Sequence, residues 1–188
     1  MGVERVDNRN PDVSAAIKTF SASKPEVISL VCTPKYAVDF IAGHKPTVSV
    51  TQYIALSNSS NDAFVKSLAG NVRGVIVTQV LPSPFNPKIA LSREYRRAAE
   101  AAKLPVSYIG LQTWVSCKLL EEGITRAGKN PTPESLIQGL ESLKRLDLGD
   151  FILSFGPNQR AGSQFLEMTT IDKEGRFLYR RAASGCHD

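Results

Sequence analysis

The stretch from Glu26 to Gly43 constrains the fold most, because it joins a strand signal to a helix signal. Residues 27–31 form a short apolar run rich in β-branched side chains, which is typical of a buried strand and too short for a helix. Pro34 follows at a position suited to the first turn of a helix, and apolar residues then recur at helical spacing up to Gly43. A strand, a loop and a helix in this order make half of a βαβ unit, which predicts a parallel sheet.

The alternation of helix and strand repeats along the first half of the chain. The predicted order is a helix beginning at Asn10–Pro11, a strand at 27–31, a helix at 35–42, a strand at 47–51, a helix at 62–68 and a strand at 74–80. Three such repeats predict a parallel sheet with right-handed crossovers, and therefore an α/β, Rossmann-like fold.

The pattern changes after residue 89, where helices follow one another without intervening strands. The predicted elements are a helix at 89–103, a helix at 108–127, a helix capped by Thr132, a strand at 151–155 and a hairpin formed by 164–171 and 176–180. The second half of the chain therefore combines helices with a small number of strands.

The composition of the 188-residue chain is that of a globular protein with a core, at 42% hydrophobic and 22% charged residues. The net charge of +5 comes from basic residues scattered along the sequence, which is typical of a solvated surface and argues against nucleic-acid binding. The polar first ten residues do not resemble a signal peptide, and no apolar run reaches the length of a membrane helix. We therefore expect no export signal within this chain.

The residue types that usually carry catalysis or bind metal ions are not grouped in this sequence. The three cysteines form no CxxC pair, and no cluster of ligand side chains has metal-binding spacing. Residues 123–130 approximate a phosphate-binding loop, but they lack its final Ser or Thr and fall at a helix carboxyl end. His44 and His187 have no partner at useful spacing, so we expect surface positions for both. The sequence predicts no catalytic centre, no cofactor and no metal.

Several segments occur in an order that is typical of one family. They are Asp12–Ile17 before Lys24–Ile28, Gly74–Val80, Ile124–Gly128, Pro133–Ile137 with Leu140–Leu143, Leu146–Gly149, Phe155–Pro157 and Asp172–Phe177. In this order the chain resembles, from Arg5 to Tyr179, the type I periplasmic solute-binding proteins of ABC importers, in the branched-chain amino acid class. The resemblance is to the carboxyl-terminal part of such a protein.

The resemblance implies two α/β lobes joined by three crossovers, with a solute enclosed between them. Residues 1–105 and 166–181 would form lobe two, residues 106–165 a helical and β remnant of lobe one, and residues 182–188 a tail. The complete protein would lie in the periplasm, bind a small polar solute without catalysis and deliver it to an ABC permease. A ligand-sensing receptor or regulator domain of the same fold is the alternative. A small hydrolase or transferase is a third interpretation, which the missing catalytic groups oppose.

Ligands of open α/β sheets bind beyond the carboxyl ends of the strands, so the loops after the first two strands form the candidate site. The candidates are Cys32, Thr33, Pro34 and Tyr36 after the strand at 27–31, Thr51, Gln52 and Tyr53 after the strand at 47–51, and, by the resemblance, Trp114. Their hydroxyl, amide and phenol groups suit an amino acid or a related polar solute.

Two further expectations concern this candidate site. Tyr36 and Tyr53 should lie on one concave surface with Thr33 and Gln52, because both loops should leave the same edge of the sheet. The acidic residue that amino-acid binders of the family often place in the second loop is absent, which weakens the case for an α-amino acid. An ordinary role in a polar loop or in core packing is the competing interpretation for each candidate.

Helices 108–127 and 133–143 carry apolar residues that, in the family, cover a sheet whose other strands are not found in this chain. These residues are Leu119, Leu120, Ile124, Leu136, Ile137 and Leu140. Burying each such side chain is worth about 1.5–3 kcal/mol, so a monomer would forgo on the order of 10 kcal/mol. We therefore expect a homodimer through residues 108–146, with solute binding weakened or lost because half of the cleft is absent.

Overall fold

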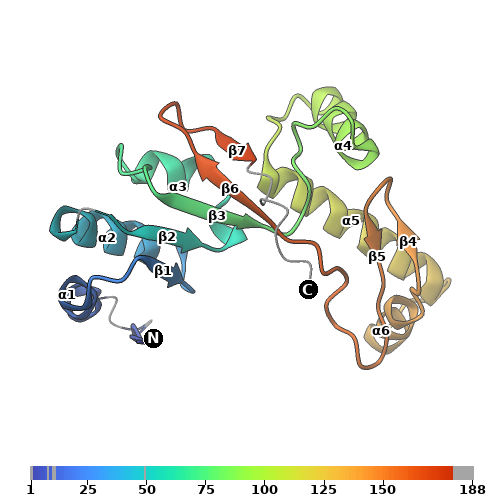
Figure 1. Cartoon of the computed structure of the whole chain (residues 1–188). Helices are drawn as coiled ribbons and strands as arrows, with labels where there is room; N and C mark the ends of the chain where they lie inside the picture. Colours follow the sequence, from blue (N-terminus) through green and yellow to red (C-terminus); the bar gives the residue numbers. More distant parts are fainter. Residues whose placement is uncertain (1, 8, 10–11, 49, 180–188) are drawn as a thin grey trace, which may run out of the picture. The chain divides into compact units, whose positions relative to one another are not determined.

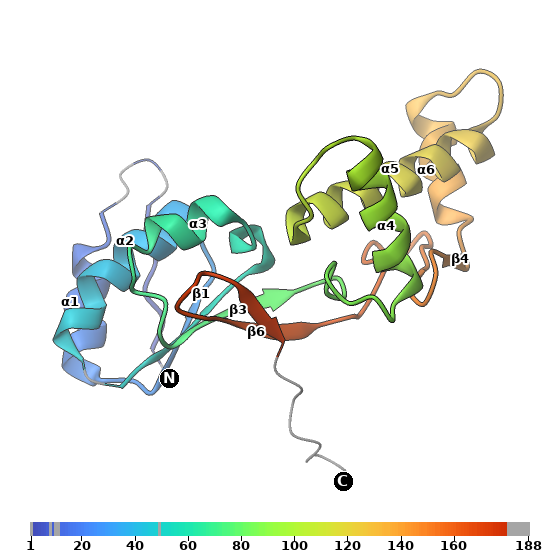
Figure 2. The ribbon, with the colours of Figure 1, turned by 90° about the horizontal axis from the view of Figure 1, so that it is seen from above.

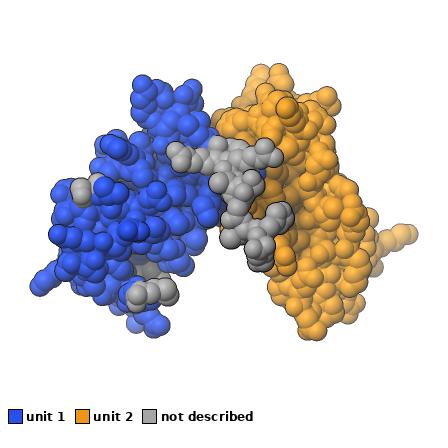
Figure 3. All heavy atoms as spheres, viewed as in Figure 1, with its two compact units in different colours: residues 1–79, 167–188 blue, residues 80–166 orange. Residues whose placement is uncertain are grey.

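The computed structural model describes residues 2–7, 9, 12–48 and 50–179. The chain divides into two compact units, which Figure 3 shows in different colours. Unit 1 comprises residues 1–79 and 167–188, and unit 2 comprises residues 80–166. The chain thus leaves unit 1 after Gln79 and returns to it at Glu167.

Unit 1 is built on a five-stranded sheet in the order β1-β2-β3-β6-β7 (Figure 1). Its strands are β1 (Val27–Leu30), β2 (Gln52–Ala55), β3 (Val75–Gln79), β6 (Glu167–Ile171) and β7 (Phe177–Tyr179). The first three strands run parallel, and the hairpin β6–β7 joins them through antiparallel pairing of β6 with β3. The predicted parallel sheet and the predicted hairpin are both confirmed.

Three helices of unit 1 cover one face of this sheet (Figure 2): α1 (Ser14–Ser23), α2 (Pro34–His44) and α3 (Asp62–Ser67). Inward and outward side chains alternate along β1: Ile28 and Leu30 are buried, whereas Val27 is 50% exposed. The predicted buried strand is therefore buried on one face. The helix expected from Asn10–Pro11 begins at Ser14, and those two residues lie outside the described part of the chain.

The second strand is not where the sequence predicted it. Thr47 ends a 3₁₀ helix (Lys45–Thr47), and the strand begins at Gln52. The alternation of Val48 and Val50 favoured a strand at 47–51, but Val50 is 81% exposed. Tyr53 is 1% exposed, so the register that buries the larger apolar surface against the helices determines the strand.

Unit 2 consists of three helices and a small two-stranded sheet. Its elements are α4 (Ala90–Ala101), α5 (Tyr108–Ala127), α6 (Pro133–Glu141), β4 (Leu146–Asp147) and β5 (Ile152–Leu153). Thr132 caps α6 as predicted, through its side-chain oxygen and the backbone N–H of Ser135. Helices α5 and α6 approach closely at glycines, since a Cβ on Gly139 would lie 2.8 Å from the carbonyl oxygen of Gly123.

The first boundary between the units precedes α4, whereas the sequence placed it after residue 105. The reason is that Leu91 and Tyr95 of α4 are buried in the same cluster as Leu111 and Val115 of α5. A helix that shares its core with α5 belongs to the same compact unit. The predicted tail at 182–188, with His187, lies outside the described residues.

Candidate functional site

The carboxyl ends of the three parallel strands form one edge of the unit 1 sheet. Leu30 pairs with Ala55 at this edge, and β3 ends at Gln79. Strand β6 is antiparallel to β3, so its first residue, Glu167, lies opposite Gln79. The loop after β1, the loop after β2 and the start of β6 therefore all lie at this edge, which we call the carboxyl edge.

The loop after β1 lies at the carboxyl edge, as predicted. Thr33 precedes α2 in an extended conformation and makes no side-chain capping bond, and Pro34 occupies the first turn. Cys32 is half-buried, which raises the pKa of its thiol. Tyr36 follows in the first turn of α2 and is also half-buried. The structure thus brings together the four predicted candidates of this loop.

The loop after β2 contains site candidates that the sequence analysis missed. It comprises Leu56 and a short 3₁₀ helix (Ser57–Ser59), followed by Ser60. The Asn58 amide donates a hydrogen bond of 3.2 Å to the backbone carbonyl of Cys32, so the two loops are joined at this edge. The signal in the sequence was the polar run that follows the apolar residues 53–56, a typical strand-to-loop transition.

A buried chain of hydrogen bonds runs inward from the carboxyl edge. The Ser60 hydroxyl donates to Gln79 Oε1 at 2.7 Å, and Gln79 Nε2 donates to the Thr169 hydroxyl at 3.0 Å. Thr169 in turn donates to the carbonyl of Val77 at 3.0 Å. Because each of these three side chains is less than 4% exposed, the network holds the loop after β2 rigidly against β3 and β6.

Glu167 is the acidic residue at this edge. Its Oε2 is buried and has no hydrogen-bond partner within the described residues. Burial also raises the pKa of this carboxyl group, because a charged carboxylate loses its hydration there. Sequence reasoning missed Glu167 because only the pairing of β6 with β3 brings it to the end of the parallel strands.

The other predicted loop lies at the opposite edge of the sheet. Thr51 donates to the carbonyl of Pro25, which precedes β1, and Gln52 is the first residue of β2. Tyr53 is buried, with its hydroxyl 2.9 Å from Nδ1 of His44. The prediction that Tyr36 and Tyr53 share one surface is therefore wrong, because β2 begins later than expected and holds Tyr53 near its amino end.

His44 is a core residue rather than the surface residue that the sequence predicted. It is fully buried and stacks on Phe40, with ring centroids 5.2 Å apart. Burial lowers the pKa of its imidazole, since the charged form is desolvated, and the carbonyl of Phe20 acts in the opposite direction. The imidazole thus packs as an aromatic ring that also pairs with Tyr53.

Trp114 lies on α5 in unit 2, where its contacts are those of a packing residue. Its ring centroid is 6.3 Å from that of Tyr95, and Lys118 Nζ lies 5.4 Å from the centroid of its indole ring. Within unit 2 it therefore packs between α4 and α5.

Neither a metal-binding cluster nor a membrane-spanning helix is found in the described part of the chain. No three His, Cys, Asp or Glu side chains there come close enough to hold a metal ion. Nor does any helix within the described ranges combine the length and hydropathy needed to cross a membrane.

Comparison with known proteins identifies one family. The sequence matches the family described as "Periplasmic binding protein" over residues 1–176. A substrate-binding periplasmic protein from Ralstonia solanacearum is 26% identical, with a TM-score of 0.77. The aligned region covers 92% of the present chain and 50% of the Ralstonia chain. Comparison with curated proteins gives no match.

Two more distant solved structures share the fold. A possible leucine/isoleucine/valine-binding protein from Rhodopirellula baltica has a TM-score of 0.79 at 23% identity, covering 95% of this chain and 52% of its own. A branched-chain amino acid ABC transporter protein from Thermus thermophilus, solved with bound valine, has a TM-score of 0.71 at 15% identity. The aligned region covers 94% of the present chain and 50% of the Thermus chain. The present chain spans about half the length of these structures.

The predicted family is therefore confirmed, since the match extends over nearly the whole sequence and the solved structures reproduce the fold. The family is one of binding proteins, in agreement with the expected non-enzymatic chain. This chain belongs to the periplasmic binding protein family.

Proposed function

We propose that this chain is part of the solute-binding component of an ABC importer and contacts its solute at the carboxyl edge of the unit 1 sheet. The observation that carries the proposal is the Asn58–Cys32 hydrogen bond, which joins the loops after two parallel strands at that edge. The carboxyl edge is where open α/β sheets bind ligands, and Thr33 and Asn58 offer polar groups there.

The solute that fits this edge is an amino acid or a related small polar molecule. The Rhodopirellula relative is described as a possible leucine/isoleucine/valine-binding protein, and the Thermus structure contains valine. On the family pattern, unit 1 corresponds to lobe two and unit 2 to part of lobe one, and the complete protein would deliver its solute in the periplasm to an ABC permease. The solute contacts are then Cys32, Thr33, Pro34 and Tyr36 together with residues 57–60.

An NMR titration of the 188-residue chain with L-leucine and L-valine tests this assignment. We expect amide shifts to concentrate in residues 32–36 and 57–60, and we expect Asn58→Ala to weaken them. Gln52→Ala is the matched control, because Gln52 is an exposed amide side chain at the opposite edge. Shifts centred on residues 51–53, or equal loss with both variants, would contradict the assignment.

For unit 2, the partner that we propose is a second copy of the chain. Of the six apolar residues expected to face water, Leu120, Ile124 and Ile137 are 48%, 42% and 49% exposed. The other three, Leu119, Leu136 and Leu140, are half-buried; the last two pack against Gly123 of α5. Unit 2 also has a cavity of about 240 Å³, which is lined in part by Leu119, Phe151 and Phe165. An apolar surface of this kind favours association.

Sedimentation equilibrium at micromolar concentration tests the proposed homodimer. We expect a dimer that Leu120→Glu disrupts, because a charge would be buried in the interface. Leu104→Glu is the control, since Leu104 is 64% exposed in unit 2 outside residues 108–146. A monomer at all concentrations, or disruption by both variants alike, would refute an interface through these helices.

A further inference from the structure

Glu167 differs from the other polar side chains at the carboxyl edge, because its buried oxygen has no partner. Ser60, Gln79 and Thr169 satisfy one another in the hydrogen-bond network described above. Their hydroxyl and amide groups are each directed at another acceptor, although Gln79 is the residue opposite Glu167 in the sheet. The described protein therefore supplies no donor to Glu167 Oε2.

The two described loops of the carboxyl edge contain one basic residue, and that residue is paired with another carboxylate. In the segments 31–36 and 56–61, the only basic residue is Lys35. Its ammonium pairs with Asp39 on the same helix at 2.6 Å. A half-buried carboxylate whose buried oxygen lacks a donor costs free energy, and a cationic partner at that oxygen would reduce the cost.

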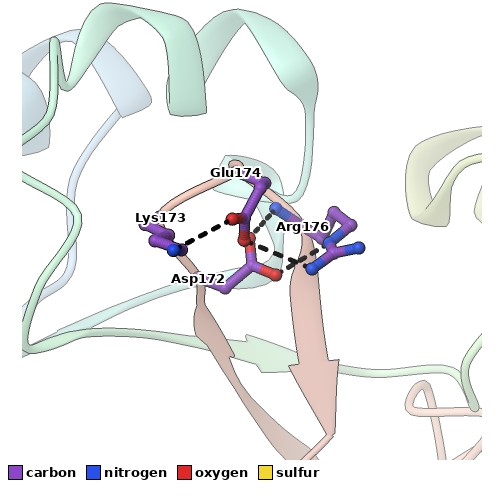
Figure 4. A network of polar contacts seen from close by, with 4 residues as sticks. All are labelled: Asp172, Lys173, Glu174 and Arg176. Carbon is purple, nitrogen blue, oxygen red and sulfur yellow. Dashed lines mark hydrogen bonds and ion pairs between the residues drawn. The ribbon is translucent and has the colours of Figure 1, made fainter.

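Glu174, in the same hairpin as Glu167, differs from it because basic side chains pair with its carboxylate. Figure 4 shows the β6–β7 turn, where Glu174 pairs with Arg176 at 3.2 Å and with Lys173 at 3.6 Å. Asp172 also pairs with Arg176, at 2.8 Å. The acidic groups of the turn are thus neutralised by basic neighbours within the chain, whereas the described residues offer no hydrogen-bond partner to the buried oxygen of Glu167.

We propose that Glu167 binds the cationic amino group of the solute, so that the solutes of this protein are primary amines such as amino acids. The inference rests on the proposed function, because it places the solute at the same edge. The loop after β2 lacks the acidic residue that amino-acid binders of the family often have there. In this chain, Glu167 of β6, opposite Gln79, would take its place. A carboxylate and an ammonium form a charge-assisted hydrogen bond, which is about twice as strong as a neutral one.

Three probes that share one carbon skeleton test the proposal on the 188-residue chain. L-leucine carries both charged groups, 3-methylbutylamine lacks the carboxylate, and 4-methylpentanoate lacks the amino group. Each probe is titrated by NMR into the wild-type chain, Glu167→Gln and the control Glu174→Gln. The dispersion of the amide spectrum reports whether each variant is folded.

We expect Glu167→Gln to weaken binding of leucine and 3-methylbutylamine by about tenfold or more. Binding of 4-methylpentanoate should not change, and Glu174→Gln should leave all three affinities unchanged. In the wild-type chain, the carboxyl carbon of Glu167 should titrate at lower pH when 3-methylbutylamine is bound, because a bound cation favours the carboxylate. This last measurement does not depend on a variant.

Two results would overturn the proposal. The first would exclude Glu167 alone, and the second would also exclude the proposed solute site. Equal binding of leucine to the wild-type chain and to Glu167→Gln, with shifts still at residues 32–36 and 57–60, would exclude Glu167 and leave the proposed edge intact. No shift at these residues with any of the three probes would exclude both Glu167 and the proposed solute site.

Discussion

Helices α2 and α5, one from each unit, differ in how fully they bury their apolar residues. In unit 1, helix α2 buries Ala37, Phe40 and Ile41 against the sheet, and the polar groups collect at the carboxyl edge. In unit 2, helix α5 buries Leu111 and Val115 but leaves Leu120 and Ile124 exposed. Because exposed apolar stripes favour association, we propose that this face of α5 makes contacts outside unit 2.

The comparison also separates the two kinds of surface on this chain. The carboxyl edge of unit 1 is polar and is braced by hydrogen bonds, which suits recognition of a small polar solute. The exposed stripe of α5 is apolar and is suited to packing against another protein surface. Unit 1 therefore carries our solute proposal, and unit 2 carries our proposal of a partner chain.

The largest expected effects come from the two separate cores. Ile41→Ala and Leu111→Ala each remove a fully buried side chain, and each should lower the free energy of unfolding by about 2–5 kcal/mol. Amide hydrogen exchange should show lost protection chiefly in unit 1 for the first variant and in unit 2 for the second. Leu104→Ala is the control, since Leu104 is exposed and lies outside the proposed interface. Equal loss in both units from either variant would show that they unfold as one.

A smaller effect should come from the glycine contact between α5 and α6. Gly139→Ala would place a methyl group against the backbone of Gly123, where a side-chain shift cannot relieve the contact. We expect a loss of roughly 1–3 kcal/mol in the stability of unit 2, measured by denaturant unfolding. Gln138→Ala, at the exposed neighbouring position, should be nearly neutral. An unchanged midpoint for Gly139→Ala would mean that the helices can separate at no cost.

Acidification should affect unit 1 through His44. Its pKa is lowered in the folded state, so the unfolded chain binds the proton more readily. The stability contributed by the neutral imidazole is therefore complete above the ordinary pKa of 6.5 and declines as the pH falls below it. Chemical unfolding between pH 5 and pH 8 should show this decline in the wild-type chain and a flatter profile in His44→Phe. Parallel profiles would exclude His44 as the cause.

The smallest expected effect is a gain in stability. Burial raises the pKa of Glu167, so holding its carboxylate charged costs stability as the pH rises above the ordinary value of 4.5. Glu167→Gln should thus raise the thermal midpoint at neutral pH, and the gain should shrink below pH 4.5. Glu174→Gln, in the exposed turn, should leave the midpoint unchanged. A lower midpoint for Glu167→Gln would reveal a stabilising partner for this carboxylate.

Local signals in the sequence were sufficient for much of the fold. The helix at 108–127 has its predicted bounds because Ser107 caps it by accepting a hydrogen bond from the Gly110 N–H, and Gly128 follows its last turn. The loop at 32–36 was predicted for a similar reason, since an apolar run followed by Pro34 marks a strand, a loop and a helix start within a few residues.

The tertiary structure decided the features that depend on distant partners. Residues 47–51 and 52–55 both contain a strand-like pattern, and only packing against α2 and β3 selects the second. His44 is buried because Tyr53 and Phe40 surround it, which its sequence neighbours do not indicate. Glu167 reaches the carboxyl edge because β6 pairs with β3 after the chain has passed through the whole of unit 2. Sequence periodicity reports the local conformation, but long-range strand pairing and burial determine which side chains meet at a site.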